Sequence, residues 1–238
     1  MFQFPYCGVQ QESISPPART SIFVRTSVDT KLDMMPDKSS SMFMVSCDGI
    51  MIETTITHEA SIVEEWIKFV SSTYTGNPKV VGLDTEWTRA QNKMKVAILQ
   101  LCVENKCLIV QLFLMNNNIP QSLKSFFVDS DFKFVGVGVI NDLNMLKSDY
   151  GLESNKGIDI SHLAKQIWPD RISSMGLKYL AKELVGLDMK KSKEVCTSEW
   201  KTKDLTRDQI EYASIDAYAS FKIGKMILSE DIMKYHDS

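Results

Sequence analysis

The sequence predicts an α/β fold built on one mixed sheet, with three antiparallel strands first, parallel strands later, and helices on its flanks. Two observations support this. Three strand-like apolar runs, at 80–87, 94–102 and 106–113, are joined by short polar turns, as in antiparallel pairs. Helical patterns then alternate with further strand-like runs, which is typical of a sheet with parallel strands.

The composition suits one domain with an additional segment, because 44% of the 238 residues are apolar. The formal net charge is −3, so that any nucleic-acid binding must use local basic patches rather than an overall positive field. No apolar run approaches the roughly 18 residues that a membrane span needs. We therefore expect no membrane partner.

The cysteines favour an intracellular protein. There are five of them, an odd number, and no two are spaced as CxxC, which favours free thiols in a reducing compartment. Cys102 and Cys107 could lie opposite each other across a hairpin, but we expect reduced thiols. The expected location is the nucleus or the cytoplasm, with organelle targeting left open by the Ser, Thr and Arg content near the start of the chain.

Four segments are expected along the chain. Residues 1–41 are predicted to be mostly disordered, and residues 231–238 form a C-terminal tail. Between them, residues 42–79 form an adjunct of a hairpin and a helix, ahead of the main domain at 80–230. These boundaries follow the change from turn-rich sequence to periodic apolar patterns.

The adjunct is predicted from a turn and a helical repeat. Asp48-Gly49 separates two β-type runs and is a strong tight-turn pair, which predicts a hairpin over 42–57. Ile62, Trp66 and Phe69 are spaced as one face of a helix over 58–70.

Helices and strands alternate over the rest of the chain. The expected elements are a helix at 119–128, a strand at 132–139, a helix at 142–150 that Gly151 ends, a short strand or turn at 157–160, helices at 160–168 and 175–185, and a last helix at 205–228. Thr206 and Gln209 are spaced as a capping box at the start of the last helix.

The first candidate site is in "VVGLDTEW", where Asp84 and Glu86 follow an aliphatic run. Positions i and i+2 of a strand project to the same face, so these carboxylates point together while Thr85 points away. Two such groups repel unless a cation lies between them, and a divalent metal with oxygen ligands would satisfy both. The alternative is that the strand simply emerges into solvent at Asp84.

The second candidate is Asp142 in "FVGVGVINDLNML", at the predicted junction of a strand and a helix. An Asp there can be a helix N-cap and nothing more. Asn141 could cap equally well, which would leave Asp142 available for another role.

The third candidate is the pair Tyr212 and Asp216 on the last helix. They are four residues apart and therefore share one face, offset from the predicted core stripe. That stripe consists of Ile210, Ala213, Ala217 and Phe221. The offset would present a phenol and an acid to an adjoining cleft; the alternative is a partly exposed helix flank.

Together, Asp84-x-Glu86, Asp142 and Tyr212-x-x-x-Asp216 resemble the three exonuclease motifs of the DEDD superfamily of 3′–5′ exonucleases. The segments "MGLKYLAKELVG", "SEW" and "LTRDQIEYASIDAYA" are similar to the Werner-type branch, and the resemblance covers about 80–228. The histidine version of the family has His five residues before the last Asp, where this chain has Glu211. Tyr212 indicates the tyrosine (DEDDy) branch.

The adjunct has a weaker resemblance to a plant-type subgroup that includes the RISC-interacting clearing exoribonucleases. Some members of that subgroup have altered metal ligands, whereas this chain has all four acids. Because those exonucleases form rings, the resemblance allows a homo-oligomer.

The resemblance implies a ribonuclease H-like (DnaQ-like) fold and two divalent cations, Mg²⁺ or Mn²⁺. Asp84 is the candidate to bridge both ions, with Glu86 and Asp216 at the ion that holds the attacking water and Asp142 at the second ion. Tyr212 is better suited to orient that water than to deprotonate it, because a phenol has a pKa of about 10.

The expected activity is hydrolysis of phosphodiester bonds from the free 3′ end of single-stranded or frayed RNA or DNA, releasing nucleoside monophosphates. One alternative is a nucleic-acid-binding or assembly subunit that keeps the fold with weak catalysis. Another is a carboxylate-metal phosphatase that acts on small phosphate esters.

Possible nucleic-acid contacts are one aromatic residue that could stack on a base and several basic residues that could contact phosphates. They are Trp87, Arg89, Lys190, Lys191, Lys193 and Arg207. The alternatives are packing for the Trp and solvated loops for the basic residues.

Overall fold

One mixed sheet runs through the molecule, in the strand order β1-β2-β3-β6-β5-β4-β7-β8. The computed structural model describes residues 22–24, 40–90, 93–116, 118–154, 157–190 and 192–229. The strands are β1 (Ile22–Val24), β2 (Ser40–Cys47), β3 (Ile50–Thr57), β4 (Lys79–Ala90), β5 (Lys93–Val103), β6 (Lys106–Val110), β7 (Phe132–Gly136) and β8 (Gly157–Asp159). β4, β5 and β6 pair antiparallel, while β4–β7 and β7–β8 pair parallel. The predicted mixed sheet is confirmed.

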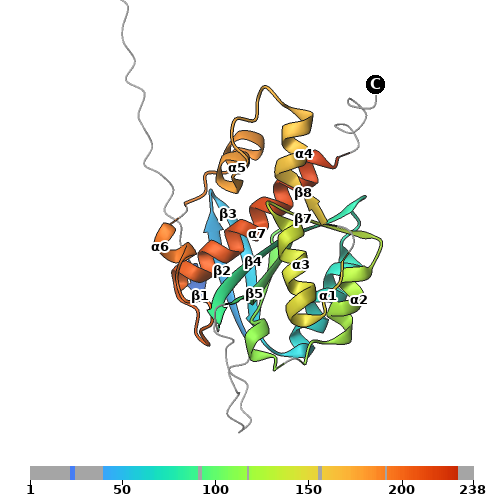
Figure 1. The fold of residues 1–238 in the computed structure, drawn as a ribbon, viewed down its shortest axis with the longest axis vertical. Helices are drawn as coiled ribbons and strands as arrows, with labels where there is room; N and C mark the ends of the chain where they lie inside the picture. Colours follow the sequence, from blue (N-terminus) through green and yellow to red (C-terminus); the bar gives the residue numbers. More distant parts are fainter. Residues whose placement is uncertain are drawn as a thin grey trace, which may run out of the picture.

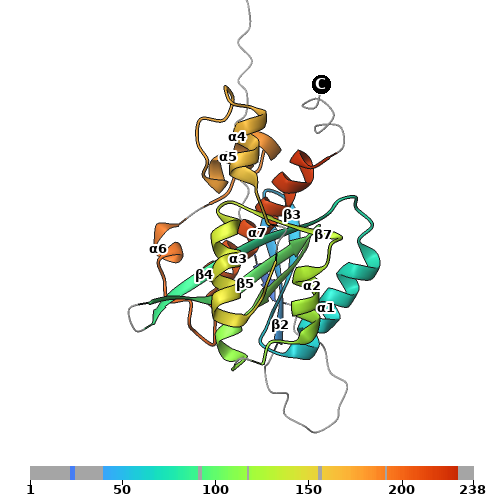
Figure 2. The same cartoon turned by 45° about the vertical axis from the view of Figure 1, so that its right-hand side comes forward.

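Helices lie on both faces of this sheet (Figures 1 and 2). They are α1 (Ala60–Thr73), α2 (Gln121–Val128), α3 (Val139–Tyr150), α4 (Ile160–Ile167), α5 (Leu177–Val185), α6 (Lys193–Cys196) and α7 (Arg207–Ile227), with a 3-10 turn, η1, at Leu112–Leu114. α7 crosses one face and contacts β4, β5, β6 and β7. α1 and α2 pack side by side on the other face, where Trp66 meets Phe126 edge to face. The short helix α6 was not predicted.

The N-terminal hairpin extends the main sheet. Asp48 and Gly49 both have positive φ, 51° and 81°, as the predicted tight turn requires. β3 then pairs parallel with β6, so that the hairpin continues the sheet beyond the antiparallel strands. β1 lies within the segment that was expected to be mostly disordered and pairs with β2. The last two residues of that segment, Ser40 and Ser41, begin β2. Its other residues, and the tail at 231–238, are outside the described residues.

α7 lies unusually close to β4, because Gly82 has no side chain. A Cβ atom at Gly82 would be 2.1 Å from the backbone oxygen of Ala217. The capping box at Thr206 and Gln209 is present, as predicted. α7 is buried on nearly all sides, however, and the interpretation of a partly exposed flank is wrong: other helices cover the side of α7 that faces away from the sheet.

Cys102 and Cys107 form a disulfide, so the expectation of reduced thiols is wrong for this pair. The register places them directly opposite each other on β5 and β6, with Cα atoms 4.2 Å apart. Among the described residues, the free cysteines are Cys47 and Cys196. In the part of the chain that the structure describes, no helix combines the length and the apolar character needed to cross a membrane.

Candidate active site

The candidate site lies beside β4, at the point where its pairing with β7 ends. That pairing stops at Gly82–Val135, whereas β4 stays paired with β5 as far as Ala90. A pocket of about 390 Å³ lies along this part of β4. Its lining residues are Asp84, Thr85, Glu86, Trp87, Met94, Val137, Gly138, Asn141, Asp142 and Cys196. Two of the three predicted motifs therefore meet in one pocket.

Asp84 and Glu86 are half-buried within β4 rather than at its end. Gly82 faces α7, and Asp84 and Glu86 share its face because each is an even number of residues further along the strand. The Thr85 backbone N–H donates to Asp84 Oδ1 at 3.0 Å. The alternative in which the strand emerges into solvent at Asp84 does not hold, since β4 continues for six further residues beyond it.

Thr85 points to the other face, as predicted, and meets Asp142 there. Its hydroxyl donates to Asp142 Oδ1 at 2.6 Å and accepts from Trp87 Nε1 at 2.6 Å. Thr85 was not among the candidate residues. Its side chain points away from Asp84 and Glu86, and a single threonine in a strand is not a recognisable motif. The contact holds Asp142 beside the edge of β4.

Asp142 is inside helix α3 and is 6% exposed. The helix begins at Val139 with Gly138 as its N-cap, three residues earlier than predicted, so the N-cap interpretation of Asp142 or Asn141 is wrong. Gly138 permits this early start because it adopts φ 74°. Burial raises the pKa of Asp142 to about 6; the Thr85 hydrogen bond acts in the opposite direction, and the charge of Asp159 raises it further.

Asp159 fixes the backbone next to Asp142. Its Oδ2 accepts the Gly138 N–H at 3.0 Å, and its Oδ1 accepts the Ser161 N–H at 2.9 Å as the N-cap of α4. Burial favours a higher pKa for Asp159, but hydrogen bonds from Ser161, Gly138 and His162 outweigh it and lower the pKa. Asp159 therefore stays ionised and holds the turn before α3.

Tyr212 and Asp216 approach the site from α7 and are 9% and 2% exposed. Burial raises the pKa of Tyr212 well above its usual range, followed by the charge of Asp216, a hydrogen bond with the Cys196 side chain and the charge of Glu86. The centroid of the Tyr212 ring also lies 6.0 Å from the centroid of the Trp200 ring. Glu86 and Asp216 thus act on the same phenol, which places the third motif next to the first.

Cys196 lies at the site, although no sequence pattern indicated it. It ends the short helix α6, is exposed, lines the pocket and hydrogen-bonds with Tyr212. No pattern predicted α6, because its four residues are too few to show a helical repeat.

The donor set around the pocket suits a hard divalent cation, since Asp84, Glu86, Asp142 and Asp216 all offer carboxylate oxygens. Asp142 is a buried acid, and its raised pKa shows that its charge is poorly compensated by the protein alone. Within the described ranges, no group of three or more His, Cys, Asp or Glu side chains is arranged as it stands to hold a metal ion. The residue types fit the predicted cations.

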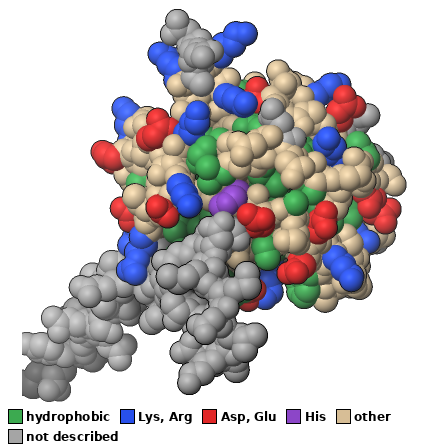
Figure 3. Space-filling view, turned by 90° about the horizontal axis from the view of Figure 1, so that it is seen from below, with side chains coloured by type: hydrophobic (Ala, Val, Ile, Leu, Met, Phe, Trp, Pro, Cys, Tyr) green, Lys and Arg blue, Asp and Glu red, His purple; other side chains and the backbone are tan. Residues whose placement is uncertain are grey.

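The predicted nucleic-acid contacts divide into two groups. Trp87 lines the pocket and also packs against the core. Arg89, Lys190, Lys193 and Arg207 are exposed and do not line the pocket. Lys191 lies outside the described residues. On the face seen in Figure 3, basic and acidic side chains are interspersed.

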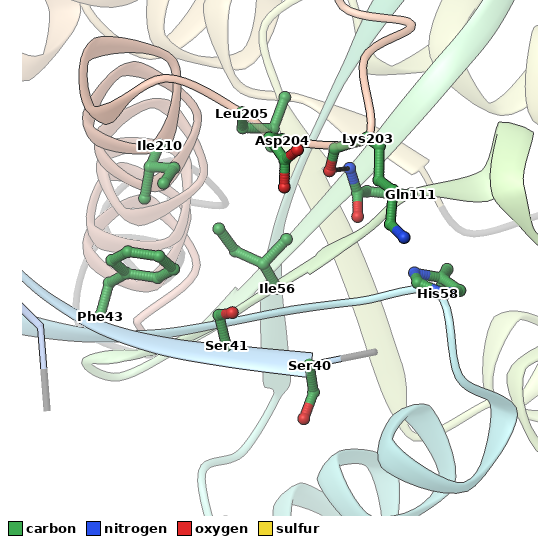
Figure 4. A pocket seen from close by; sticks show the side chains of 10 residues that line it. All are labelled: Ser40, Ser41, Phe43, Ile56, His58, Gln111, Lys203, Asp204, Leu205 and Ile210. Atoms are coloured by element: carbon green, nitrogen blue, oxygen red, sulfur yellow. Dashed lines mark hydrogen bonds between the residues drawn. The ribbon is translucent and has the colours of Figure 1, made fainter. Parts of the chain in front are cut away.

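A larger cavity, of about 440 Å³, lies between the hairpin and the loop before α7 (Figure 4). Phe43 and Ile210 are on one side of it, and Gln111 on the other. The Gln111 amide donates to the backbone oxygens of Thr202 and Lys203 at 3.0 and 2.9 Å. None of the predicted acids lines this cavity, so its size does not make it the candidate site.

Comparison with known proteins shows to which family the chain belongs. A family model described as 3′–5′ exonuclease matches residues 54–230. A "3′-5′ exonuclease" of Arabidopsis thaliana is 36% identical over 62% of this chain and 52% of its own. The mouse "Bifunctional 3′-5′ exonuclease/ATP-dependent helicase WRN" is 32% identical over 60% of this chain and 10% of its own. The chain thus spans about half the length of the first relative and a small part of the second.

A solved structure shows the same fold. Escherichia coli RNase D superposes with a TM-score of 0.61 at 19% identity, over 76% of this chain and 44% of that chain. The predicted ribonuclease H-like fold is confirmed. With a family model that matches most of its length, the chain belongs to the 3′–5′ exonuclease family.

Proposed function

We propose that this protein is a divalent-metal-dependent 3′–5′ exonuclease that acts on the free 3′ end of single-stranded or frayed nucleic acid and releases nucleoside monophosphates. The observation that carries the proposal is the pocket beside β4, where Asp84 and Glu86 meet Asp142 from α3. Membership of the 3′–5′ exonuclease family supports the same activity.

The acids of the site would hold two Mg²⁺ or Mn²⁺ ions. Asp84, Glu86 and Asp216 would serve one position, and Asp84 with Asp142 the other. When bound, divalent cations lower the pKa of water and neutralise the charge that develops on the phosphate. The protein supplies the carboxylates: Thr85 holds Asp142, and α7, which carries Asp216, packs on β4.

In this proposal, the protein belongs to the tyrosine branch of the DEDD superfamily because it has Tyr212. A phenol with a pKa of about 10 already keeps its proton at neutral pH, and the raised pKa of Tyr212 extends this to higher pH, so the hydroxyl can donate a hydrogen bond. It would orient the attacking water or the scissile phosphate and would not act as the base. Tyr212→Phe should lower kcat with little change in the affinity for the cation.

The sheet edges also allow self-association, which we include in the proposal. β1 and β8 are the outer strands of the sheet among the described residues, and an edge strand presents unpaired N–H and C=O groups to a neighbour. Light scattering on the purified chain should give a mass of at least twice the 27.0 kDa of one chain, and a mass of 27.0 kDa would contradict self-association.

The test of function uses a 5′-labelled oligonucleotide, as RNA and as DNA, with Mg²⁺, with Mn²⁺ or with EDTA. A ladder of shortened products that requires metal, and that a blocked 3′ end prevents, supports the exonuclease. Release of phosphate from mononucleotides, with no effect of a 3′ block, would instead identify a phosphatase.

A pair of variants separates catalysis from binding. Asp84→Asn should abolish the ladder, and Asp170→Asn, at an exposed acid outside the pocket, should leave it unchanged. If wild type and Asp84→Asn bind the oligonucleotide and are equally inactive under all metal conditions, the protein is a binding subunit and the proposal is wrong.

A further inference from the structure

Gln100 on β5 is a polar residue that is fully buried among apolar core residues. Its side chain is 0% exposed, and neither its amide nitrogen nor its amide oxygen has a hydrogen-bond partner among the described residues. Buried polar atoms in native proteins almost always have partners, and leaving them without one destabilises the fold. The position therefore calls for a functional explanation.

The register places Gln100 directly opposite Asp84. The two residues are Cα partners in the antiparallel β4–β5 pair. Side chains of such a pair project to the same face, with Cβ atoms about 4.5–5.5 Å apart. Because Gly82 faces α7 and Asp84 follows two residues later, Gln100 also projects into the layer between the sheet and α7.

Within the sheet, the other neighbours of Gln100 on this face have no polar side chain that could satisfy its amide. Ile98 lies two residues before it on β5 and Ile109 directly opposite it on β6, and Cys102, two residues after it, is in the disulfide. Ile98, Cys102 and Ile109 are all 0% exposed. Asp84 is thus the polar side chain that directly faces Gln100 across the strand pair.

We propose that Gln100 is a positioning residue for Asp84, donating from its amide NH₂ group to the Asp84 carboxylate when the site holds its cations. This inference rests on the proposed function. Carboxylates that bind metal are usually held in turn by a hydrogen-bond donor behind them, and loss of that donor lowers metal affinity by about 10–100-fold. A glutamine amide supplies two N–H donors and no charge, so it would orient the carboxylate without neutralising it.

Gln100→Met tests the proposal, because methionine has a similar volume and shape without the polar atoms. In EDTA the variant should melt at least about 2 °C above wild type, since it removes two unpartnered polar atoms from the core. Its Mn²⁺ dissociation constant, from calorimetry and from melting shifts in a Mn²⁺ titration, should rise about 10–100-fold. If Gln100 only contributes to packing, the variant should instead have a lower melting temperature and an unchanged Mn²⁺ dissociation constant.

Ile109→Met is the matched control, because it alters packing in the same layer on the side of Gln100 away from Asp84. It should keep the wild-type Mn²⁺ affinity. If Gln100→Met does not fold, Gln100→Leu replaces it in the same measurements. A Gln100 variant with wild-type Mn²⁺ affinity overturns the role of Gln100 alone, whereas a wild-type protein with no Mn²⁺ binding overturns the proposed function and this inference with it.

Discussion

The hydroxyl of Thr85 donates a 2.6 Å hydrogen bond to Asp142 Oδ1, joining two residues that are 57 positions apart. Thr85 lies between Asp84 and Glu86 but points to the opposite face of β4. Because the pairing of β4 with β7 has ended at this level, the two faces meet at the open edge of the strand. A single strand can therefore deliver two acids from one face and hold a third from the other.

Thr85→Val should weaken metal binding. The substitution keeps the shape of the side chain and removes the hydroxyl, so that Asp142 loses its donor and Trp87 Nε1 loses its acceptor. We expect the Mn²⁺ concentration for half-maximal activity to rise about 10-fold or more, with a loss of about 1–2 kcal/mol in the free energy of unfolding. Metal titrations of activity and urea unfolding measure the two effects.

Thr88→Val is the matched control for this change. Thr88 is also a buried threonine of β4, but its hydroxyl donates to Glu199 at 3.0 Å and does not reach Asp142. It should lose a comparable amount of stability and keep the wild-type metal requirement. Equal metal requirements in the two variants would contradict the role given to Thr85.

Gly82→Ala should push α7 away from β4. The added methyl group would meet the Ala217 backbone oxygen at 2.1 Å and the Phe221 backbone nitrogen at 2.6 Å, and neither backbone atom can move independently of the helix. Overpacking of this kind costs about 1–3 kcal/mol or more. Because Asp216 precedes Ala217, the shift should also reduce exonuclease activity, measured alongside thermal unfolding.

Gly176→Ala provides the comparison, since the nearest atom to its added Cβ would be Ser174 Oγ at an ordinary 3.8 Å. Gly176 is the N-cap of α5, where alanine is less favourable than glycine, so this variant should lose some stability, but less than Gly82→Ala, and should keep wild-type activity. A Gly82→Ala protein as stable and as active as Gly176→Ala would contradict the close approach of α7 to β4.

Sequence patterns were informative for features set by the spacing of functional residues along a strand or a helix. The alternation in β4 predicted that Asp84 and Glu86 share a face, and the four-residue spacing predicted the same for Tyr212 and Asp216. The Thr206 and Gln209 capping box also marked the start of α7 correctly. Each of these depends on residues that are neighbours in the chain.

Features that depend on distant contacts were missed. The Thr85–Asp142 bond, the place of Cys196 at the pocket and the missing partners of Gln100 all arise from packing between elements. The predicted start of α3 is three residues too late, because the left-handed conformation of Gly138 leaves no mark in the hydrophobic pattern. Counting cysteines predicted reduced thiols and missed the Cys102–Cys107 disulfide, because a count does not report strand register.

Asp159→Ala should destabilise the protein at neutral pH by about 1–2 kcal/mol, because α4 loses its N-cap and the Gly138 N–H loses its acceptor. The pKa of Asp159 is lower in the folded protein than in the unfolded chain, where it is about 4. The contribution of the ionised carboxylate to the free energy of unfolding is therefore fully present above pH 4 and is lost as pH falls through the folded pKa. The difference from wild type should therefore shrink at pH 3. Urea unfolding at pH 7 and pH 3 measures it.

Asp159→Asn separates the cap from the charge, because asparagine caps helices about as well as aspartate. It should be closer to wild type than Asp159→Ala at pH 7. If Asp159→Ala equals wild type at pH 7, the hydrogen bonds of Asp159 do not stabilise the turn before α3.

Tyr150→Phe should change how stability responds to alkaline pH. The Tyr150 hydroxyl donates to the Val96 backbone oxygen at 2.6 Å, and burial, with the charge of Asp149, raises its pKa to about 12. An unfolded tyrosine has a pKa of about 10, so between pH 10 and 12 the unfolded chain loses this proton while the folded protein keeps it. The stabilisation is thus complete below pH 10 and is lost as pH rises through about 12.

Phenylalanine has no proton to lose, so Tyr150→Phe should be less stable than wild type by about 1–2 kcal/mol at pH 8, where it lacks the hydrogen bond. Between pH 9 and 11 this difference in the free energy of unfolding should narrow by about 1 kcal/mol, because only wild type loses stability as Tyr150 ionises in the unfolded chain. Urea unfolding of both proteins at pH 8, 9, 10 and 11 measures the gap. Parallel curves across this range would show that the Tyr150 hydroxyl titrates alike in the folded and unfolded protein, against the burial and hydrogen bond described for it.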